Sequence, residues 1–318
     1  MVEVVQAFFK EGYLLRQLNH TFIRLILKFQ GAAKVKHFRP ISLCNVCYKI
    51  ITKIMANRLA PLLGKMISPL QGAFVPGRWI AENVMLAKEV LHFMRHKQGQ
   101  GSVAGFKVDM MKAYDHIEWG FLLKILEDFG FSNRWRNMIT QCITTVKFSV
   151  LVNGSLFGFF SSSRGIRQGD PLSPYLFILC NEVLSRMLLQ REKEDKLHGI
   201  LVGRGCPHIS HLMFADDLML FCKPTADEVE VLKECLDTYE QWSGQRKNKE
   251  ISSIFGSCNA SEERVTDLGA IMGVSSTLDV FEYLELTMTI WGRYKGTFDD
   301  VVDKIKSRLM GWHAKALS

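Results

Sequence analysis

Three aspartates stand where carboxylates could do metal-assisted chemistry. Asp109 ends a predicted buried strand, VAGFKVD, and Asp216 and Asp217 lie at the tip of a predicted hairpin, HLMFADDLMLF. Adjacent carboxylates beside buried strands repel each other unless a cation lies between them. Mg²⁺ prefers a few carboxylates together with substrate phosphates. Two such ions about 3.5–4 Å apart can activate a 3′-hydroxyl and stabilise a departing pyrophosphate.

A simpler interpretation of the aspartate pair stays open. Aspartate tolerates the backbone angles of tight turns, so FADD alone is also typical of an ordinary hairpin turn. Met213 and Phe214 precede the pair, and the apolar run 218–221 follows it. These flanks predict buried strands, and buried strands favour the metal site over the plain turn.

The elements that must position these carboxylates form a mixed pattern. Strands are predicted at 21–29 and 103–109, and hairpins at 147–160 and 211–221. Helical spacing of apolar residues predicts helices at 4–9, 50–63 and 80–94, two before about 145, one from Pro171, and further helices past 227, including a basic one at 292–312. Strands in the middle with helices around them indicate an α+β fold.

Bulk composition limits the class of protein. The 318 residues are 47% hydrophobic, enough for a large core with two or three lobes. No uncharged apolar stretch is long enough to cross a bilayer, so no membrane partner is expected. The acidic start is unlike a signal peptide. Eight cysteines without framework spacing are typical of a reduced intracellular protein.

The placement of charge says more than its size. The formal net charge is +8, and between Met1 and Arg58 ten basic residues stand against Glu3 and Glu11. A basic segment on a nearly neutral remainder suits a polyanion such as nucleic acid. A merely solubilising surface is the alternative.

Three motifs occur in the order of reverse transcriptase motifs A, B and C. They are FKVDMMKAYDHIEW (106–119), RGIRQGDPLSP (164–174) and FADD (214–217). RPISLCNVCYKIITKIMANRL (39–59) and QGAFVPGR (71–78) resemble the fingers of the same polymerases. From about residue 4 to 318, the chain therefore resembles the reverse transcriptase domain of a plant LINE-type, non-LTR retrotransposon.

The resemblance implies a fold and an activity. The fold would be a right-hand polymerase, with fingers, a palm built on an antiparallel sheet, and a partial helical thumb. The activity would be RNA-directed DNA synthesis, which extends a DNA primer on an RNA template. Its substrates would be dNTPs and its cofactor Mg²⁺, with Mn²⁺ as a substitute. The family also implies a nuclear location.

The resemblance also assigns catalytic roles. Asp109 and Asp216 would hold both metals, with Asp217 as the third acid. Tyr114 would lie beneath the sugar and exclude a 2′-hydroxyl, although an ordinary buried aromatic is the alternative. Asp115, in the same KAYD, is interpreted as structural and as a cap for the following helix.

Substrate contacts are implied at further positions. Gln168 and Gly169 would approach the nucleotide closely, unless they simply form the loop before a helix. Arg39 and Lys28 would reach the incoming triphosphate. Contacts to template and primer are implied for Arg164 and for the C-terminal Lys304, Lys306 and Arg308, where a solvated helix face is the alternative.

The implied domains are fingers at 1–103, palm at 104–118, a fingers–palm connection at 119–160, palm again at 161–256, and a partial thumb at 257–318. The helices between motifs A and B are expected to return to the fingers. The chain lacks an upstream endonuclease domain and stops soon after the thumb begins, so we expect it to be a fragment of a retroelement.

Several positions depart from the family pattern. Leu27 replaces a proline, and Glu285 and Thr287 replace a glycine and a proline. Ile251 stands where the family commonly has lysine, a candidate general acid worth roughly 10²–10⁴-fold in rate. Lys247 and Lys249 are nearby candidates to replace it.

Two alternatives to the polymerase stay open. The first is a catalytically inert, nucleic-acid-binding remnant, which the departures favour and the intact aspartates oppose. The second is a neighbouring polymerase type, a group II intron maturase or an RNA-templated RNA polymerase, which Tyr114 and RQGDPLSP disfavour.

Overall fold

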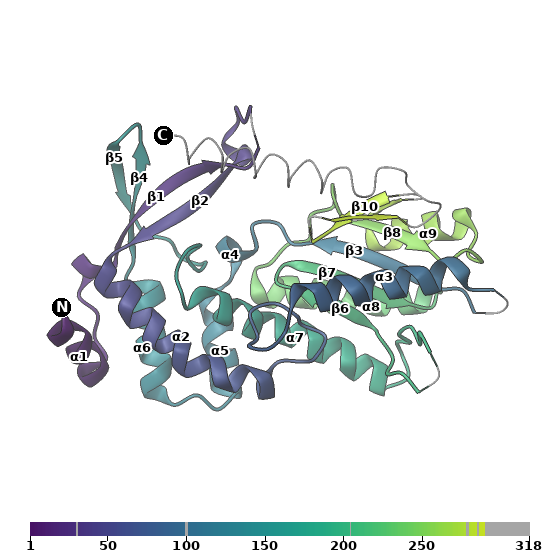
Figure 1. Cartoon of the computed structure of the whole chain (residues 1–318), viewed down its shortest axis with the longest axis horizontal. Coiled ribbons are helices and arrows are strands. Elements are labelled where there is room, and N and C mark those ends of the chain that lie inside the picture. The colour runs from purple at the N-terminus through teal and green to yellow at the C-terminus, as the bar shows by residue number, and fades with distance from the viewer. Residues whose placement is uncertain (30, 99–100, 204, 278–279, 285, 290–318) are drawn as a thin grey trace, which may run out of the picture.

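The computed structural model describes residues 1–318 apart from 30, 99–100, 204, 278–279, 285 and 290–318. The described chain forms two lobes side by side, each built on its own sheet (Figure 1). The first lobe has a four-stranded sheet of order β2-β1-β4-β5, and the second has a five-stranded sheet of order β6-β7-β3-β8-β9. Strands β4 and β5 follow β3 in the chain, so the backbone leaves the second lobe and returns to it.

Strand β1 (His20–Leu27) lies in the middle of the first sheet. It pairs antiparallel with β2 (Phe38–Cys44) and parallel with β4 (Lys147–Val152), and β4 pairs antiparallel with β5 (Ser155–Phe160). The β4–β5 turn contains Asn153 and Gly154, both with positive φ, as two-residue hairpin turns require. The predicted hairpin at 147–160 is therefore confirmed.

Helices accompany the first sheet on its lower side in Figure 1. They are α1 (Val2–Glu11), α2 (Val46–Met66) and α6 (Asn133–Thr144). Short 3-10 turns precede β1 at Arg16–Asn19 and β2 at Val35–His37. Helix α2 begins where the Asn45 side chain accepts a hydrogen bond from the Cys47 amide, and α6 begins where Ser132 accepts one from the Trp135 amide. Such caps satisfy amides that have no partner within the helix.

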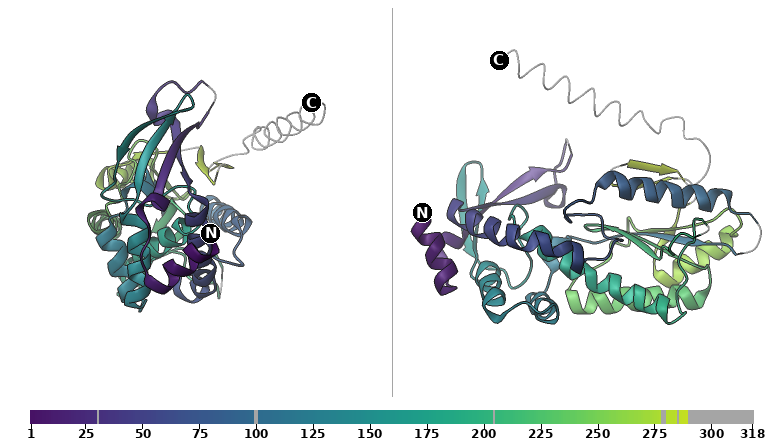
Figure 2. Two further views of the ribbon diagram at one scale, coloured as in Figure 1. Left: turned by 90° about the vertical axis from the view of Figure 1, so that its left-hand side faces the viewer. Right: turned by 60° about the horizontal axis from the view of Figure 1, so that its bottom comes forward.

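The second sheet contains β3 (Ala104–Asp109), β6 (His211–Phe214), β7 (Asp217–Cys222), β8 (Ser253–Gly256) and the two-residue β9 (Ser275–Ser276). Its strands are antiparallel except for the parallel β8–β9 pair. Helix α3 (Ile80–His96) and the β10–β11 hairpin (Val280–Tyr283 and Leu286–Thr289) cover one face of this sheet. Helices α7 (Ser173–Lys193), α8 (Ala226–Ser243) and α9 (Glu262–Met272) cover the other (Figure 2).

Successive side chains along the strands of the second sheet point to opposite faces, so the sheet has an apolar layer on each side. Val108, Leu218 and Leu220 point into the larger core beneath α7 and α8, whereas Met219 and Phe221 point into the smaller layer beneath α3. The short α4 (Ala113–His116) and α5 (Trp119–Asp128) continue the larger core toward the first lobe. No helix within the described part of the chain is long and apolar enough to cross a membrane.

Some elements differ from the sequence predictions. Helix α7 begins at Ser173, two residues after the predicted Pro171, and in the turn before it the Asp170 carboxylate accepts a hydrogen bond from the Leu172 amide at 3.1 Å. Strand β2 was not predicted because it contains Pro40, which is tolerated since β2 is an edge strand. The strands β8 to β11 are two to four residues long, too short for a periodic signal. The expected fingers range 1–103 includes α3, which packs on the second sheet.

Candidate active site

The three aspartates meet at one end of the second sheet. Asp109 and Asp217 are directly opposite each other in the antiparallel β3–β7 ladder. The β6–β7 turn consists of Ala215 and Asp216, so Asp217 is the first residue of β7 and not part of the predicted tip. All three aspartates line a cavity of about 970 Å³. The structure thus brings the three predicted carboxylates to the wall of one cavity.

The β6–β7 turn is held by two amides outside it. Ala215 has a φ of 54°, a left-handed conformation that is rare for residues with a side chain. Its amide donates to Gln71 Oε1 at 3.1 Å, and its carbonyl accepts from Asn181 Nδ2 at 2.8 Å. Tyr239 in turn donates its hydroxyl proton to Asn181 at 2.9 Å. This network presents the Asp216 side chain to the cavity on a fixed turn.

A lysine of motif A, Lys107, neutralises part of this site, a role that the motif did not predict. Lys107 Nζ lies 3.5 Å from Asp109 Oδ1 and 3.2 Å from Asp217 Oδ1. It precedes Asp109 by two residues on β3, so both side chains share one face of the sheet. That alternation, together with the placement of Asp109 at a strand end, is the signal that could have found it.

Desolvation dominates the electrostatics of the carboxylates. It raises the pKa of Asp109 above its usual range, while the nearby Lys107 and Lys28 ammonium groups lower that pKa. Desolvation also raises the pKa of Asp216, and the charges of Asp217 and Asp109 raise it further. A divalent cation would relieve this cost, because it supplies the positive charge that the cluster lacks.

Carboxylate oxygens are suitable donors for a divalent ion such as Mg²⁺. Among the described residues, however, no group of three or more His, Cys, Asp and Glu side chains already converges as a metal site. Asp109 and Asp217 both contact Lys107 instead. The residues present therefore fit a divalent ion by their chemistry, and small side-chain movements would have to complete the site.

Tyr114 lies on the short helix α4, close enough to Asp216 for that charge to affect its hydroxyl, but it does not line the aspartate cavity. Its ring stacks on Phe177 of α7, with ring centroids 4.9 Å apart and planes 10° from parallel. Burial, and secondarily the charge of Asp216, raises the pKa of its hydroxyl, so the phenol stays neutral. Asp115 was predicted to cap the following helix, and this is wrong. It lies inside α4, and the residue before α5 is Glu118, whose side chain makes no cap.

The motif B loop connects both lobes. The Gln168 carbonyl accepts a hydrogen bond from the Ser42 amide of β2 at 2.9 Å. Gly169 has a φ of 100°, and a Cβ there would lie 3.2 Å from the Ser42 carbonyl oxygen. Glycine is needed at this position because the loop passes against the edge strand in a backbone conformation that other residues avoid.

A buried arginine, also missed from the sequence, fixes the same loop. Arg167 donates to Asn19 Oδ1 at 2.6 Å and to the Cys142 carbonyl at 2.7 Å, and its guanidinium lies over the Tyr48 ring. Asp170 accepts a hydrogen bond from the Tyr48 hydroxyl at 2.6 Å. Buried charge is tolerated here because each group is paired. This network locks motif B onto the first lobe.

The predicted substrate contacts fall into three groups. Arg39 lines the aspartate cavity, and Lys28 lies near enough to influence Asp109. Arg164 pairs with Glu118 at 3.2 Å at a separate hollow of about 280 Å³, which Gln168 also lines. Three basic residues and one family departure lie outside the described residues, namely Lys304, Lys306, Arg308 and Glu285.

Neither Lys247 nor Lys249 replaces the lysine that is missing at position 251. Ile251 lines the aspartate cavity and is 55% exposed. Lys247 Nζ is paired with Asp237 at 2.8 Å, and Lys249 lies beside Gly273 at the end of α9. Both lysines therefore point away from the position that the family lysine would occupy.

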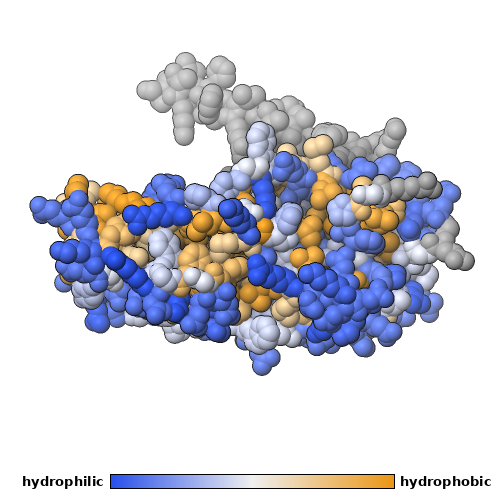
Figure 3. Space-filling view, turned by 90° about the horizontal axis from the view of Figure 1, so that it is seen from below, coloured by the Kyte–Doolittle hydropathy of each residue, from blue (hydrophilic) through white to orange (hydrophobic). Residues whose placement is uncertain are grey.

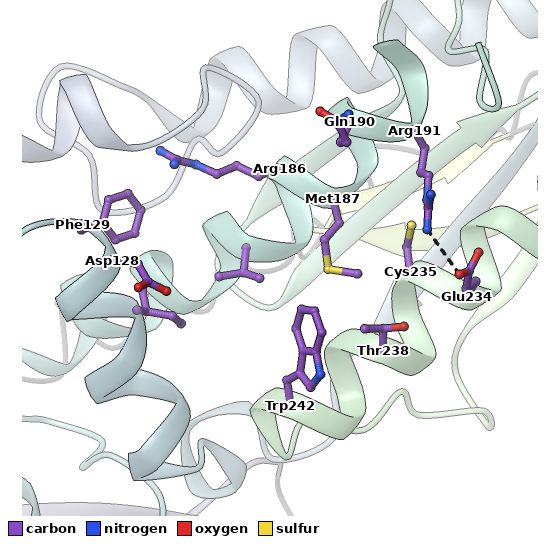
Figure 4. Close-up of a pocket in the computed structure, with 12 residues that line it drawn as sticks. Asp128, Phe129, Arg186, Met187, Gln190, Arg191, Glu234, Cys235, Thr238 and Trp242 are labelled. Atoms are coloured by element: carbon purple, nitrogen blue, oxygen red, sulfur yellow. Dashed lines mark hydrogen bonds and ion pairs between the residues drawn. The ribbon is translucent and has the colours of Figure 1, made fainter. Parts of the chain in front are cut away.

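A second large hollow lies away from the aspartates. It has a volume of about 650 Å³, and Figure 4 shows its walls on α5, α7 and α8, with Trp242, Met187 and Phe129 pointing inward. Figure 3 shows the molecule from below, and on this face hydrophobic residues are exposed among the hydrophilic ones. The charged residues of the hollow are engaged locally, as in the Arg191–Glu234 and Lys124–Asp128 pairs. None of the residues predicted to do chemistry lines it.

Comparison with known proteins identifies the family. Residues 26–252 match the family described as reverse transcriptase (RNA-dependent DNA polymerase). This chain belongs to the reverse transcriptase family. Among its relatives is a transposon TX1 149 kDa protein of Xenopus laevis, 31% identical over 250 residues, which are 79% of this chain and 18% of that protein. Another is the Pol polyprotein of the R2DM retrotransposable element of Drosophila melanogaster, 27% identical over 278 residues, 85% of this chain and 25% of that protein.

These relatives confirm the resemblance of this chain to non-LTR retrotransposon proteins. An uncharacterized mitochondrial protein of Arabidopsis thaliana is 54% identical over 67 residues, 21% of this chain and 55% of that protein. The plant origin stays a prediction. The chain spans between 18% and 55% of the length of these three relatives.

Solved structures confirm the fold class. A telomerase of Candida tropicalis, in complex with a fragment of telomeric RNA, has a TM-score of 0.54 at 12% identity, covering 91% of this chain and 46% of that chain. The apo telomerase of the same organism has a TM-score of 0.54 at 14% identity, covering 91% of this chain and 51% of that one. This chain therefore has a right-hand polymerase fold, as predicted.

Proposed function

We propose that this chain catalyses RNA-directed DNA synthesis, the extension of a DNA primer on an RNA template with dNTPs. One observation carries the proposal. In a member of the reverse transcriptase family, Asp109, Asp216 and Asp217 come from two neighbouring strand ends into one cavity. The cavity is large enough for a nucleotide, since ligand sites typically have volumes of about 300–1,000 Å³.

Membership of this family implies dependence on a divalent metal ion. We propose Mg²⁺, with Mn²⁺ as a substitute, held by Asp109, Asp216 and Asp217. When bound, such ions activate the primer 3′-hydroxyl and stabilise the leaving pyrophosphate. The chain's own residues would orient the substrates: Tyr114 would exclude a 2′-hydroxyl by its fixed ring, and Arg39 and Lys28 would pair with the triphosphate.

We assign the remaining predicted contacts and regions in the same way. Gln168 and Gly169 would approach the nucleotide from motif B, and Arg164 would contact the template–primer together with Lys304, Lys306 and Arg308. The first lobe would be the fingers and the second the palm. The palm would then include α9 and β9, which were predicted to be part of a thumb at 257–318. Residues 290–318 of that range lie outside the described residues. A nuclear location is also proposed, and imaging of a tagged chain would test it.

Primer extension tests the activity. The purified chain is given an RNA template, a DNA primer, dNTPs and Mg²⁺ or Mn²⁺, and is compared with the Asp216→Asn, Asp217→Asn double variant. Asp128→Asn, which changes an exposed aspartate of α5, is the matched control. We expect extension by the parent and the control, and none by the double variant. Extension by all three would refute the assignment of the aspartates.

The isoleucine at position 251 supports a second candidate function, that of an inert, nucleic-acid-binding remnant. Ile251 lines the aspartate cavity but brings no basic group to it, and Lys247 is engaged with Asp237. Binding of template–primer that weakens with salt, without extension in either metal, would support this remnant over the polymerase.

A further inference from the structure

Lys107 is a buried cation placed between two of the three aspartates. Its side chain is 9% exposed, and its ammonium contacts Asp217 at 3.2 Å and Asp109 at 3.5 Å. Along the palm sheet its register partners are Met219 of β7 and Ser253 of β8. Met219 is fully buried, so the lysine stem lies beside an apolar layer and only its charged end reaches the carboxylates.

A buried ammonium has to be paired, because desolvation of an unpaired charge is costly. The partners of Lys107 are Asp109 and Asp217, the carboxylates to which the proposed function assigns a divalent ion. Lys107 Nζ contacts one Oδ1 atom on each. A metal ion bound to these oxygens would lie within a few ångströms of the ammonium, at a distance where like charges repel strongly in a poorly solvated site.

The ammonium also explains why the two carboxylates can face each other at all. Asp109 and Asp217 are directly opposite in the ladder, and like charges in that position destabilise a sheet. A cation between them removes this repulsion. Lys107 thus supplies, from within the chain, part of the positive charge that a divalent ion would bring.

We propose that Lys107 is an internal counter-ion, which holds Asp109 and Asp217 in place in the metal-free chain and competes with the divalent ion for them. This inference rests on the proposed function, since it assumes that these carboxylates bind the metal. It assigns Lys107 a positioning role: metal binding has to displace the ammonium from the carboxylate oxygens, and the affinity for the metal is lowered accordingly.

Metal binding measured without nucleic acid tests the inference. The full chain is titrated with Mn²⁺, and free Mn²⁺ is followed by electron paramagnetic resonance. Lys107→Met keeps the length of the side chain and removes its charge, whereas Lys107→Arg keeps the charge. Lys247→Met is the matched control, because Lys247 is also a buried lysine, 7% exposed, and its carboxylate partner is Asp237.

We expect Lys107→Met to bind Mn²⁺ about tenfold more tightly than the parent, the effect of removing one unfavourable charge interaction. Lys107→Arg and Lys247→Met should stay close to the parent. Added Mn²⁺ should also raise the melting temperature of Lys107→Met more than that of the parent, because tighter binding to the folded state stabilises it further.

Unchanged or weaker Mn²⁺ binding by Lys107→Met would overturn the inference while leaving the proposed function intact. No saturable binding by either the parent or Lys107→Met would overturn the inference together with the metal-dependent function. If circular dichroism shows that Lys107→Met is unfolded, Lys107→Gln makes the same test, since its amide donates hydrogen bonds without charge.

Discussion

Asp109 and Asp217 are directly opposite residues of the β3–β7 ladder, and one lysine, Lys107, bridges them. At this end of the second sheet, the repulsion between like charges and the cost of desolvation are opposed by one internal cation. Substitutions that change the charge of this cluster should affect stability and metal response together, because both depend on the same carboxylates.

Asp216→Asn should stabilise the metal-free chain. Desolvation raises the pKa of Asp216 above the ordinary value of 3.8. The folded state then holds this proton more strongly than the unfolded state, so its contribution is complete below pH 3.8 and is lost as the pH rises through the raised pKa. In chelator at about pH 7, we expect the variant to melt at a higher temperature than the parent.

The difference should shrink as the pH falls through the window just above 3.8, and calorimetry over that range measures it. Mg²⁺ should stabilise the parent and have little effect on Asp216→Asn, since ligand binding to the folded state is what raises its stability. Asp128→Asn controls for the loss of an exposed charge. A variant that melts below the parent at neutral pH would contradict the prediction.

Tyr114→Val should weaken discrimination against ribonucleotides. The Tyr114 ring is held flat against Phe177, so it forms a fixed wall, and a smaller side chain would leave room for a 2′-hydroxyl. We expect the ratio of ribonucleotide to deoxynucleotide incorporation, measured as kcat/KM, to rise about 10–200-fold. Tyr114→Phe keeps the ring and should leave the ratio unchanged. Equal ratios in all three proteins would exclude Tyr114 as the sugar gate.

Gly169→Ala should destabilise the junction between motif B and β2. A Cβ would meet the Ser42 carbonyl oxygen at 3.2 Å, in addition to the cost of a φ of 100°. Gly154→Ala is the matched control, because Gly154 also has a positive φ but has open space around its Cβ position. Urea unfolding should show a loss of about 1 kcal/mol for the control and a larger loss for Gly169→Ala. Equal losses would show that the contact with Ser42 is unimportant.

Ile251→Lys should accelerate nucleotide addition. Ile251 lines the catalytic cavity, whereas Lys247 and Lys249 are held elsewhere. A lysine at 251 could protonate the leaving pyrophosphate, and general acid catalysis is typically worth about 10²–10⁴-fold. Single-turnover extension by Ile251→Lys, with Ile251→Met as the uncharged control, measures the gain. The same increase in both variants would indicate a packing effect, and no increase would rule out a missing general acid.

The sequence by itself predicted many of the local elements and indicated the three aspartates to which we assign the metal. Alternation of residues 147–160 around Gly154 predicted a hairpin, and Gly154 has the positive φ that such a turn requires. Alternating apolar residues predicted that Asp109 ends a buried strand, and the order of three motifs indicated the reverse transcriptase family that the comparisons confirmed. These features depend on neighbouring residues in the chain, which sequence patterns record directly.

Only the tertiary structure decided which side chains meet across the chain. The register of β3 against β7 brings Lys107 to Asp217, and the packing of β2 against motif B places Ser42 beside Gly169. The tertiary structure also pairs Lys247 with Asp237, away from the cavity that Ile251 lines. Such partners are set by long-range strand pairing and core packing, and no local spacing encodes them.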